Sequence, residues 1–192
     1  MTATWRETQK ANRRAQLLES AASLFAERGF AAVTTVELGE AVGMSGPALY
    51  KHFASKEAIL AELLVDASER LLSGCRVILA GPDATPTDRL DELIRFHIGF
   101  AVAAPDIIRI QDRELAGLPA DINHRVRALQ RTYVAEWDAV LAAARPALTP
   151  AERGVRLLGT FGLLNSTPHS APGGGAEAER VLARMAHDAL LG

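Results

Sequence analysis

Side chains that can contact an anion are concentrated in one short stretch near the start of the chain. Tyr50, Lys51 and His52 are consecutive, and Lys10, Lys51 and Lys56 are the only lysines of the sequence. Hydroxyl, ammonium and imidazole groups donate hydrogen bonds to DNA phosphates, and such contacts position a protein without reading base sequence. This stretch is therefore the first candidate for contact with an anionic partner.

Two short helices are the elements that would position these side chains. Thr34 can cap a helix that runs to about Val42. After Gly43, Ser45 can cap a second helix that ends near Phe53. Two helices joined by a tight turn containing glycine form a helix-turn-helix, whose second helix enters the major groove of DNA. A helical hairpin with a solvated basic face explains the spacing equally well.

The second short helix begins with small residues, which permits close approach to base edges. Pro47 and Ala48 can touch thymine methyl groups in the major groove. Thr35 and Ser55 stand at helix N-termini, where hydroxyl and backbone N–H groups can bind phosphate. The residues therefore allow both base and phosphate contacts.

The stretch from residue 29 to residue 60 closely resembles the DNA-binding domain of TetR-family transcriptional regulators. The most specific part is LYKHF at residues 49–53 followed by SKE at residues 55–57. The resemblance covers about residues 11–65 and implies a ligand-responsive repressor that binds a palindromic operator as a dimer. It implies DNA contacts by Thr35, Ser45, Gly46, Pro47, Ala48, Tyr50, Lys51, His52 and Lys56.

Two glycines depart from the family pattern. Gly46 stands where other members can carry a base-reading polar side chain, so that readout would be lost or replaced by backbone contacts. Gly39 stands where alanine is usual, which should loosen the helix slightly. The segment before the first helix holds Arg6, Lys10, Arg13 and Arg14. It either follows the DNA backbone or enters the minor groove, or it is an ordinary charged tail.

Composition indicates an all-α protein. Among its 192 residues 48% are hydrophobic, 23% charged and only 5% aromatic, while Ala and Leu dominate and no alternating strand pattern occurs. A helix capped by Ser55 is expected to reach about Ala80. Further helices are expected at about 12–28, 87–103, 106–115, 120–144, 150–167 and 176–191, with a loop over 168–175.

Charge and composition also restrict the function. Residues 1–56 carry a net charge of +2 and residues 57–192 one of −4, a difference that suggests two modules. The resemblance implies that these are an N-terminal arm with a helix-turn-helix DNA-binding domain (1–56) and a helical regulatory domain (57–192). Cys75, the single cysteine, excludes an intramolecular disulfide, and no apolar run approaches the ~20 residues of a membrane span. A cytoplasmic protein without membrane contact is expected.

The second half of the chain is expected to bind a small molecule and a second copy. The resemblance implies a homodimer through helices 150–167 and 176–191 and a pocket for an effector, either lipid-like or an acyl-CoA. His97 lies on an apolar stripe, so it is either a core residue or a ligand contact. The candidate ligand-binding residues are His97, Tyr133, Trp137, Phe161, Asn165, Ser166 and His169.

Catalytic motifs are absent from the sequence. The histidines form no i, i+4 metal pair, and neither a nucleophile elbow nor a phosphate loop nor a dinucleotide-binding pattern occurs. No cofactor, metal site or catalytic residue is therefore expected. The alternative to a regulator is a small helical enzyme or ligand carrier without specific DNA binding.

Overall fold

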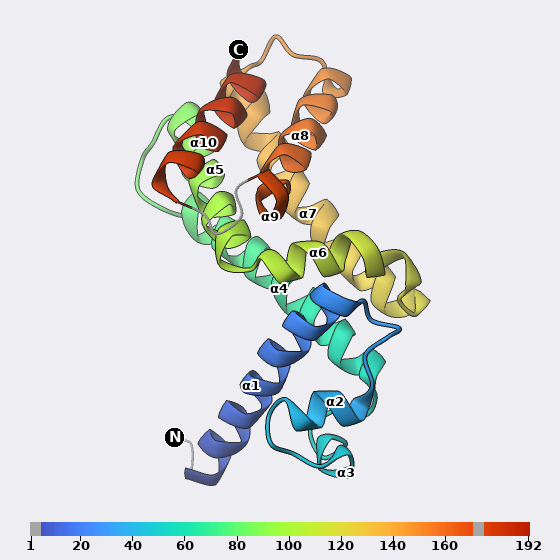
Figure 1. Cartoon of the computed structure of the whole chain (residues 1–192). Helices are drawn as coiled ribbons and strands as arrows, with labels where there is room; N and C mark the ends of the chain where they lie inside the picture. The colour runs from blue at the N-terminus through green and yellow to red at the C-terminus, as the bar shows by residue number, and fades with distance from the viewer. Residues whose placement is uncertain (1–4, 171–174) are drawn as a thin grey trace.

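The computed structural model describes residues 5–170 and 175–192, and those residues form helices with no strand among them. The helices are α1 (Trp5–Arg28), α2 (Thr35–Glu40), α3 (Gly46–Leu49), α4 (Lys56–Leu79), α5 (Pro86–Ala103), α6 (Pro105–Glu114), the 3-10 turn η1 (Leu115–Gly117), α7 (Ala120–Ala144), α8 (Pro150–Leu164), α9 (Thr167–Ser170) and α10 (Ala176–Leu191). Figure 1 shows α1, α2 and α3 at one end, with α4 leading into the larger helical part. The predicted all-α fold is confirmed.

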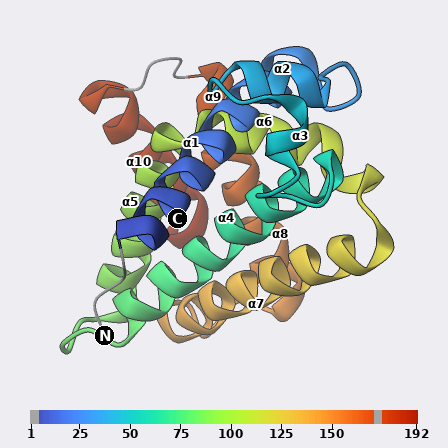
Figure 2. The same ribbon diagram turned by 90° about the horizontal axis from the view of Figure 1, so that it is seen from below.

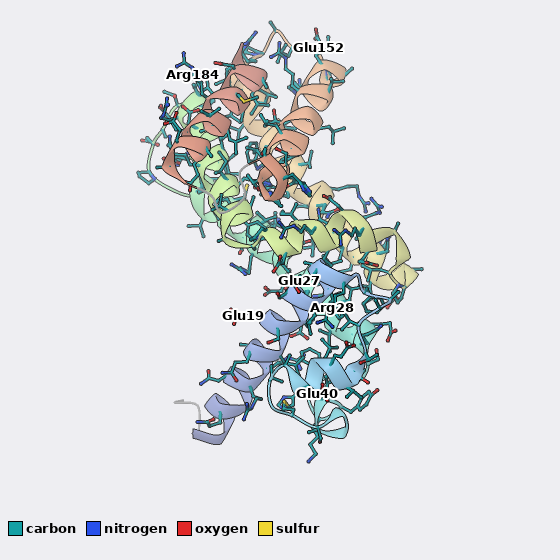
Figure 3. All side chains as sticks on the ribbon, in the orientation of Figure 1. Glu19, Glu27, Arg28, Glu40, Glu152 and Arg184 are labelled. Atoms are coloured by element: carbon teal, nitrogen blue, oxygen red, sulfur yellow. The ribbon has the colours of Figure 1, made fainter. Side chains whose placement is uncertain are left out.

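Side-chain caps fix the starts of several helices. Thr34, Thr85 and Thr149 each accept a hydrogen bond from the third residue of the helix that follows, and the side chain at that residue bonds back to the threonine N–H. Glu152, whose side chain accepts a hydrogen bond from the N–H of Thr149, is labelled in Figure 3 at the start of α8. Ser55 accepts from the N–H of Ala58 at the start of α4. These side-chain bonds satisfy N–H groups that a helix start leaves unpaired.

The structure corrects the predicted loop over residues 168–175. Thr167–Ser170 form the short helix α9, and residues 171–174 lie outside the described part. Pro168 is compatible with this helix because it stands in the first turn, where no helical hydrogen bond needs its missing N–H. The preceding helix α8 ends at Leu164 instead of 167, with Asn165 as its C-cap. At the other end of the chain, α1 begins at Trp5, well before the expected residue 12.

Two main hydrophobic cores share α4. The first core lies between α1, α2, α3 and the first half of α4, with Phe25, Leu49 and Leu64 fully buried. The second core continues from Leu72 through α5, α7, α8 and α10. Seen from the end that carries α2 and α3, the long helices α4 and α7 run side by side (Figure 2). Because the first core reaches Leu64, it joins α1, α2, α3 and the first half of α4 into one packed unit, here called the helix-turn-helix unit.

Among the described helices, none is long and apolar enough to cross a membrane.

Candidate nucleic-acid interface and ligand cavity

The turn between α2 and α3 depends on a glycine backbone. Gly43 has φ +66°, a left-handed conformation that side-chain-bearing residues rarely adopt, and the N–H of Met44 then donates to the carbonyl of Gly39 (2.8 Å). Leu38 and Leu49 are both buried, so the two helices are fixed against the same core. The turn and the core together hold α3 at the surface of the molecule.

Several of the predicted DNA-contact residues are accessible on this surface. Tyr50 is 53% exposed, Lys51 and Ser45 are also exposed, and Thr35 and Ala48 are half-buried. His52 is half-buried as well. The first two residues of α3 are Gly46 and Pro47, whose side chains lie outside the described set. The exposed hydroxyl and ammonium groups are hydrogen-bond donors of the kind that bind phosphate.

The ammonium group of Lys56 is hydrogen-bonded to the backbone within the protein instead of pointing freely into solvent. Its Nζ donates to the carbonyl oxygens of Phe30 (2.7 Å) and Val33 (2.8 Å) and lies 4.3 Å from the centre of the Phe30 ring. Two of its three N–H donors are therefore used within the protein, where they fix the segment between α1 and α2. This arrangement departs from the expected phosphate contact, and Lys56 is not retained among the proposed DNA contacts.

The side chains of Arg13 and Arg14 on α1 are also used within the protein. Arg14 pairs with Glu62 and donates to the carbonyl of His52, and its guanidinium carbon lies 3.9 Å above the Phe53 ring. Arg13 donates to the carbonyl of Val42 at 3.2 Å. Both side chains tie α1 to the rest of the helix-turn-helix unit.

α6 connects this unit to the rest of the molecule. Arg113 donates to the carbonyl of Ala26 in the last turn of α1 (2.9 Å), and Glu114 accepts from the N–H of Phe30 (3.1 Å). Ile110 is fully buried in the first core. Movement of α6 would therefore be transmitted directly to the end of α1.

A cavity of about 170 Å³ lies among α4, α5, α6, α7 and α8. Its lining carries no charged side chain: the residues are Ala67, Ser68, Leu71, His97, Phe100, Ile108, Gln111, Gln130, Tyr133, Val134, Leu158, Phe161 and Asn165. Apolar walls with a few convergent polar groups are typical of small-molecule sites, which usually measure 300–1,000 Å³. The cavity as it stands admits a small group or a short apolar chain.

His97 forms the centre of the polar part of the cavity. Its Nδ1 lies 3.1 Å from the Tyr133 hydroxyl and its Nε2 lies 3.0 Å from Oδ1 of Asn165. The amide oxygen can only accept, so Nε2 carries the proton and the tyrosine hydroxyl donates to Nδ1. Burial lowers the pKa of His97 to about 4, and burial also raises the pKa of Tyr133. Both groups are therefore neutral near pH 7, and this network joins α5, α7 and the end of α8.

Four of the seven predicted ligand residues line the cavity: His97, Tyr133, Phe161 and Asn165. Trp137 is fully buried behind them, with its ring centre 5.0 Å from that of Phe161.

Ser166 and His169 lie outside the lining. The hydroxyl of Ser166 donates to the carbonyl of Leu163, and His169 is exposed. Neither is retained in the proposed site.

Sequence reasoning missed the amides and hydroxyl that complete the cavity. Ser68, Gln111 and Gln130 come from three different helices, α4, α6 and α7. Ser68 is buried with its hydroxyl bonded to the carbonyl of Leu64 (2.8 Å), and its place in the apolar stripe of α4 was the one available signal.

An apolar face remains exposed on α8 and α10. Val155 and Leu158 are 74% and 67% exposed on α8, and Val181 and Met185 are 43% and 49% exposed on α10. A Cβ built at Gly159 or at Gly162 of α8 would meet no atom within 4 Å. Nothing within the described chain therefore explains these two glycines, although glycine in a helix costs about 1 kcal/mol relative to alanine.

Among the described residues, no group of three or more His, Cys, Asp or Glu side chains is placed to hold a metal ion. Burial raises the pKa of the Cys75 thiol to about 11. This cysteine is therefore a poor nucleophile at neutral pH.

Family models match most of the chain. Residues 17–63 match the bacterial regulatory proteins of the tetR family, and residues 83–192 match the tetracyclin repressor-like C-terminal domain. The two matches correspond to the helix-turn-helix unit and to the helices around the cavity.

Individual relatives agree with these matches. The chain is 34% identical over 130 residues to the HTH-type transcriptional repressor KstR2 of Rhodococcus jostii, covering 67% of this chain and 59% of the relative. The match thus spans less than two thirds of that relative's length. A TetR-family transcriptional regulator of Bordetella parapertussis superposes with a TM-score of 0.84, 27% identity and 93% coverage of both chains. The ketosteroid transcriptional regulator KstR2 of Mycobacterium tuberculosis superposes with a TM-score of 0.80, 28% identity and the same coverage.

Proposed function

Because the chain belongs to the TetR family of bacterial regulatory proteins, we propose that it is a transcriptional repressor that binds a palindromic operator as a homodimer and is released by a small-molecule effector. The observation that carries this proposal is the joining of an exposed helix-turn-helix surface to a charge-free cavity through one short helix, α6. An enzyme needs reactive groups in its pocket, whereas the two titratable side chains of this cavity, His97 and Tyr133, are neutral and hydrogen-bonded to each other.

The DNA-binding surface is formed by α3 and its flanks. We expect Tyr50, Lys51, His52, Thr35 and Ser45 to contact phosphates, and these contacts set the register of the protein on DNA without specifying sequence. Gly46, Pro47 and Ala48 at the start of α3 approach the base edges. The relative from Rhodococcus jostii, 34% identical to this chain, is a transcriptional repressor, which supports operator DNA as the partner.

The apolar face of α8 and α10 supports dimerisation with a second copy. Val155, Leu158, Gly159 and Gly162 follow one another at spacings of three, one and three residues, so they form one stripe along α8. Small residues in such a stripe let two helix backbones approach closely, and the exposed Met185 of α10 extends the same apolar surface. This face corresponds to helices 150–167 and 176–191, through which the resemblance implies a homodimer.

The effector class follows from the cavity lining. The walls hold no charge, and His97 and Tyr133 are neutral, so an ionised group would lose its hydration without a compensating partner. The apolar part of the effector, a lipid-like chain or the acyl group of an acyl-CoA, would occupy the cavity with a hydroxyl or carbonyl facing His97, Gln111 and Asn165. The cavity must widen to admit more than a short chain, and α6, which contributes Ile108 and Gln111 to its wall, is one of the five helices that can give way.

Selection of genomic DNA fragments by the purified protein tests this function. We expect enriched fragments to share a two-fold symmetric site whose half-sites present successive major grooves, about 34–36 Å apart. The Lys51→Ala variant should bind the same fragments more weakly, and Arg76→Ala, in the last turn of α4 where it pairs with Glu136, should bind them as the wild type does. No enrichment over bulk DNA, together with turnover of a small molecule, would contradict the proposal and favour an enzyme.

A further inference from the structure

Basic side chains line one side of the exposed face of α7. A shallow groove between η1 and α7 is lined by Ala116, Leu118, Ala120, Asn123, His124, Arg127 and Arg131. His124, Arg127 and Arg131 are here called the α7 basic patch. No acidic side chain lines this groove, although acidic residues outnumber basic ones in the whole chain.

The donors of the patch are largely unused within the described part of the chain. Arg127 donates only from Nε, to the side-chain oxygen of Asn123 (3.0 Å), which leaves both terminal nitrogens available. Arg131 and His124 are exposed and take part in no hydrogen bond or ion pair with the described residues. Arg125 differs, because it lies on another side of the same helix and pairs with Glu69 at 2.7 Å.

The patch begins where the wall of the cavity meets solvent. Successive residues of an α-helix are about 100° apart around its axis. Going around α7 in one direction, the order is Tyr133, Gln130, Val134, Arg127 and Arg131. Tyr133 is buried, Gln130 and Val134 are half-buried, and both arginines are exposed. The first three line the cavity, so the patch lies directly outside it.

We propose that the α7 basic patch binds the phosphate groups of an amphipathic ligand whose apolar end occupies the cavity. This inference rests on the proposed function in taking the cavity as the effector site. The cavity offers no charge to an anionic head, so such a head stays outside, within reach of the adjacent patch. Guanidinium forks match phosphate oxygens geometrically and remain charged at any physiological pH.

Titration calorimetry with two matched probes tests this site. The first probe is hexanoyl-coenzyme A, and the second is the hexanoyl thioester of N-acetylcysteamine, which has the same acyl thioester but no phosphate. Wild-type protein should bind the first probe at least about tenfold more tightly at low salt, an advantage that added salt reduces. The Arg127→Gln/Arg131→Gln double variant should lose this advantage and still bind the second probe. Arg125→Gln, on the same helix, should behave as wild type.

Several results would overturn the inference. Equal affinity of the wild type for both probes, or binding of neither, would show that the patch does not hold a ligand head. Wild-type affinity of the double variant for hexanoyl-coenzyme A would show the same. A double variant that keeps its ligand affinities but loses affinity for selected DNA would assign the patch to the nucleic acid. The DNA-fragment selection described above judges the proposed regulator function separately, because it needs no ligand.

Discussion

Gln111 and its neighbour Ile110 face two different sites: Gln111 lines the cavity, and Ile110 is fully buried in the core of the helix-turn-helix unit. α6 is only ten residues long, so a ligand that pushes on one side of it must disturb the other. α4 also runs from one unit to the other and contributes Ala67 and Ser68 to the cavity. The two helices therefore connect the cavity directly to the helix-turn-helix unit.

Removal of the Arg113 side chain should weaken the coupling between ligand and DNA. Arg113→Ala deletes the hydrogen bond to Ala26 that holds α6 to α1, while it touches neither the cavity lining nor α3. We expect operator affinity without ligand to change little and the ligand-induced loss of affinity to shrink several-fold. Fluorescence anisotropy with labelled operator measures both quantities. Asp112→Ala, an exposed neighbour, is the control. An equal loss of coupling in both variants would contradict the role of the Arg113–Ala26 hydrogen bond.

Alanine at the α8 glycines should stabilise the monomer and weaken the dimer. A Cβ at Gly159 or Gly162 has open space within the chain, so each substitution should raise helix stability by about 1 kcal/mol. The same methyl groups would separate two closely packed copies. Analytical ultracentrifugation should show a raised dimer dissociation constant. Gly99→Ala on α5, also exposed with open space, should stabilise the fold without this effect; an unchanged dimer in the Gly159 and Gly162 variants would place the interface elsewhere.

The two lysines flanking the end of the helix-turn-helix should behave differently. Lys51→Ala should reduce the slope of log affinity against log salt by about one unit per lost phosphate contact. Lys56→Met should leave the slope nearly unchanged and lower the free energy of unfolding by about 1–3 kcal/mol, because the carbonyls of Phe30 and Val33 lose a charged donor. Urea unfolding and salt-dependent anisotropy separate these effects. A reduced slope with unchanged stability for Lys56→Met would restore Lys56 to the DNA contacts.

His97 should make the fold sensitive to mild acid. Above pH 6.5 the imidazole is neutral in both the folded and unfolded chains, so it contributes no pH dependence. Between pH 6.5 and 4 the unfolded chain takes up a proton that the buried ring refuses, because burial lowers the pKa of His97 to about 4. Stability should fall across this window by up to about 3 kcal/mol relative to His97→Gln. Urea unfolding at several pH values measures the difference, and parallel stability curves for the two proteins would contradict the assignment.

Local features of the fold could be predicted from the sequence with good accuracy. The helix expected from residue 150 begins there as α8, and α7 has the expected bounds of 120–144. These features depend on residues three or four apart, which is the range that capping and helical periodicity describe. The short helix α9 was missed because a proline in the first helical turn looks, in sequence, like a helix breaker.

Features that join distant segments could not be predicted. The acceptors of Lys56 are backbone carbonyls 23 and 26 residues away. Every residue has such a carbonyl, so the sequence does not indicate which ones accept. The lining of the cavity depends on which faces of five helices meet, so Gln111 and Gln130 looked like ordinary surface amides. His97 was found because its apolar stripe showed that it points inward, but its two partners lie 36 and 68 residues further on.

The measurement that tests the account most directly is a pair of linked titrations. Operator affinity is measured with and without saturating hexanoyl-coenzyme A, and the affinity for hexanoyl-coenzyme A is measured with and without operator. A coupling of about 1–3 kcal/mol, typical of such systems, would lower both affinities by the same factor of about 5–150. A ligand that binds the cavity with equal affinity in the presence and absence of operator, and leaves the operator affinity unchanged, would contradict ligand-released repression.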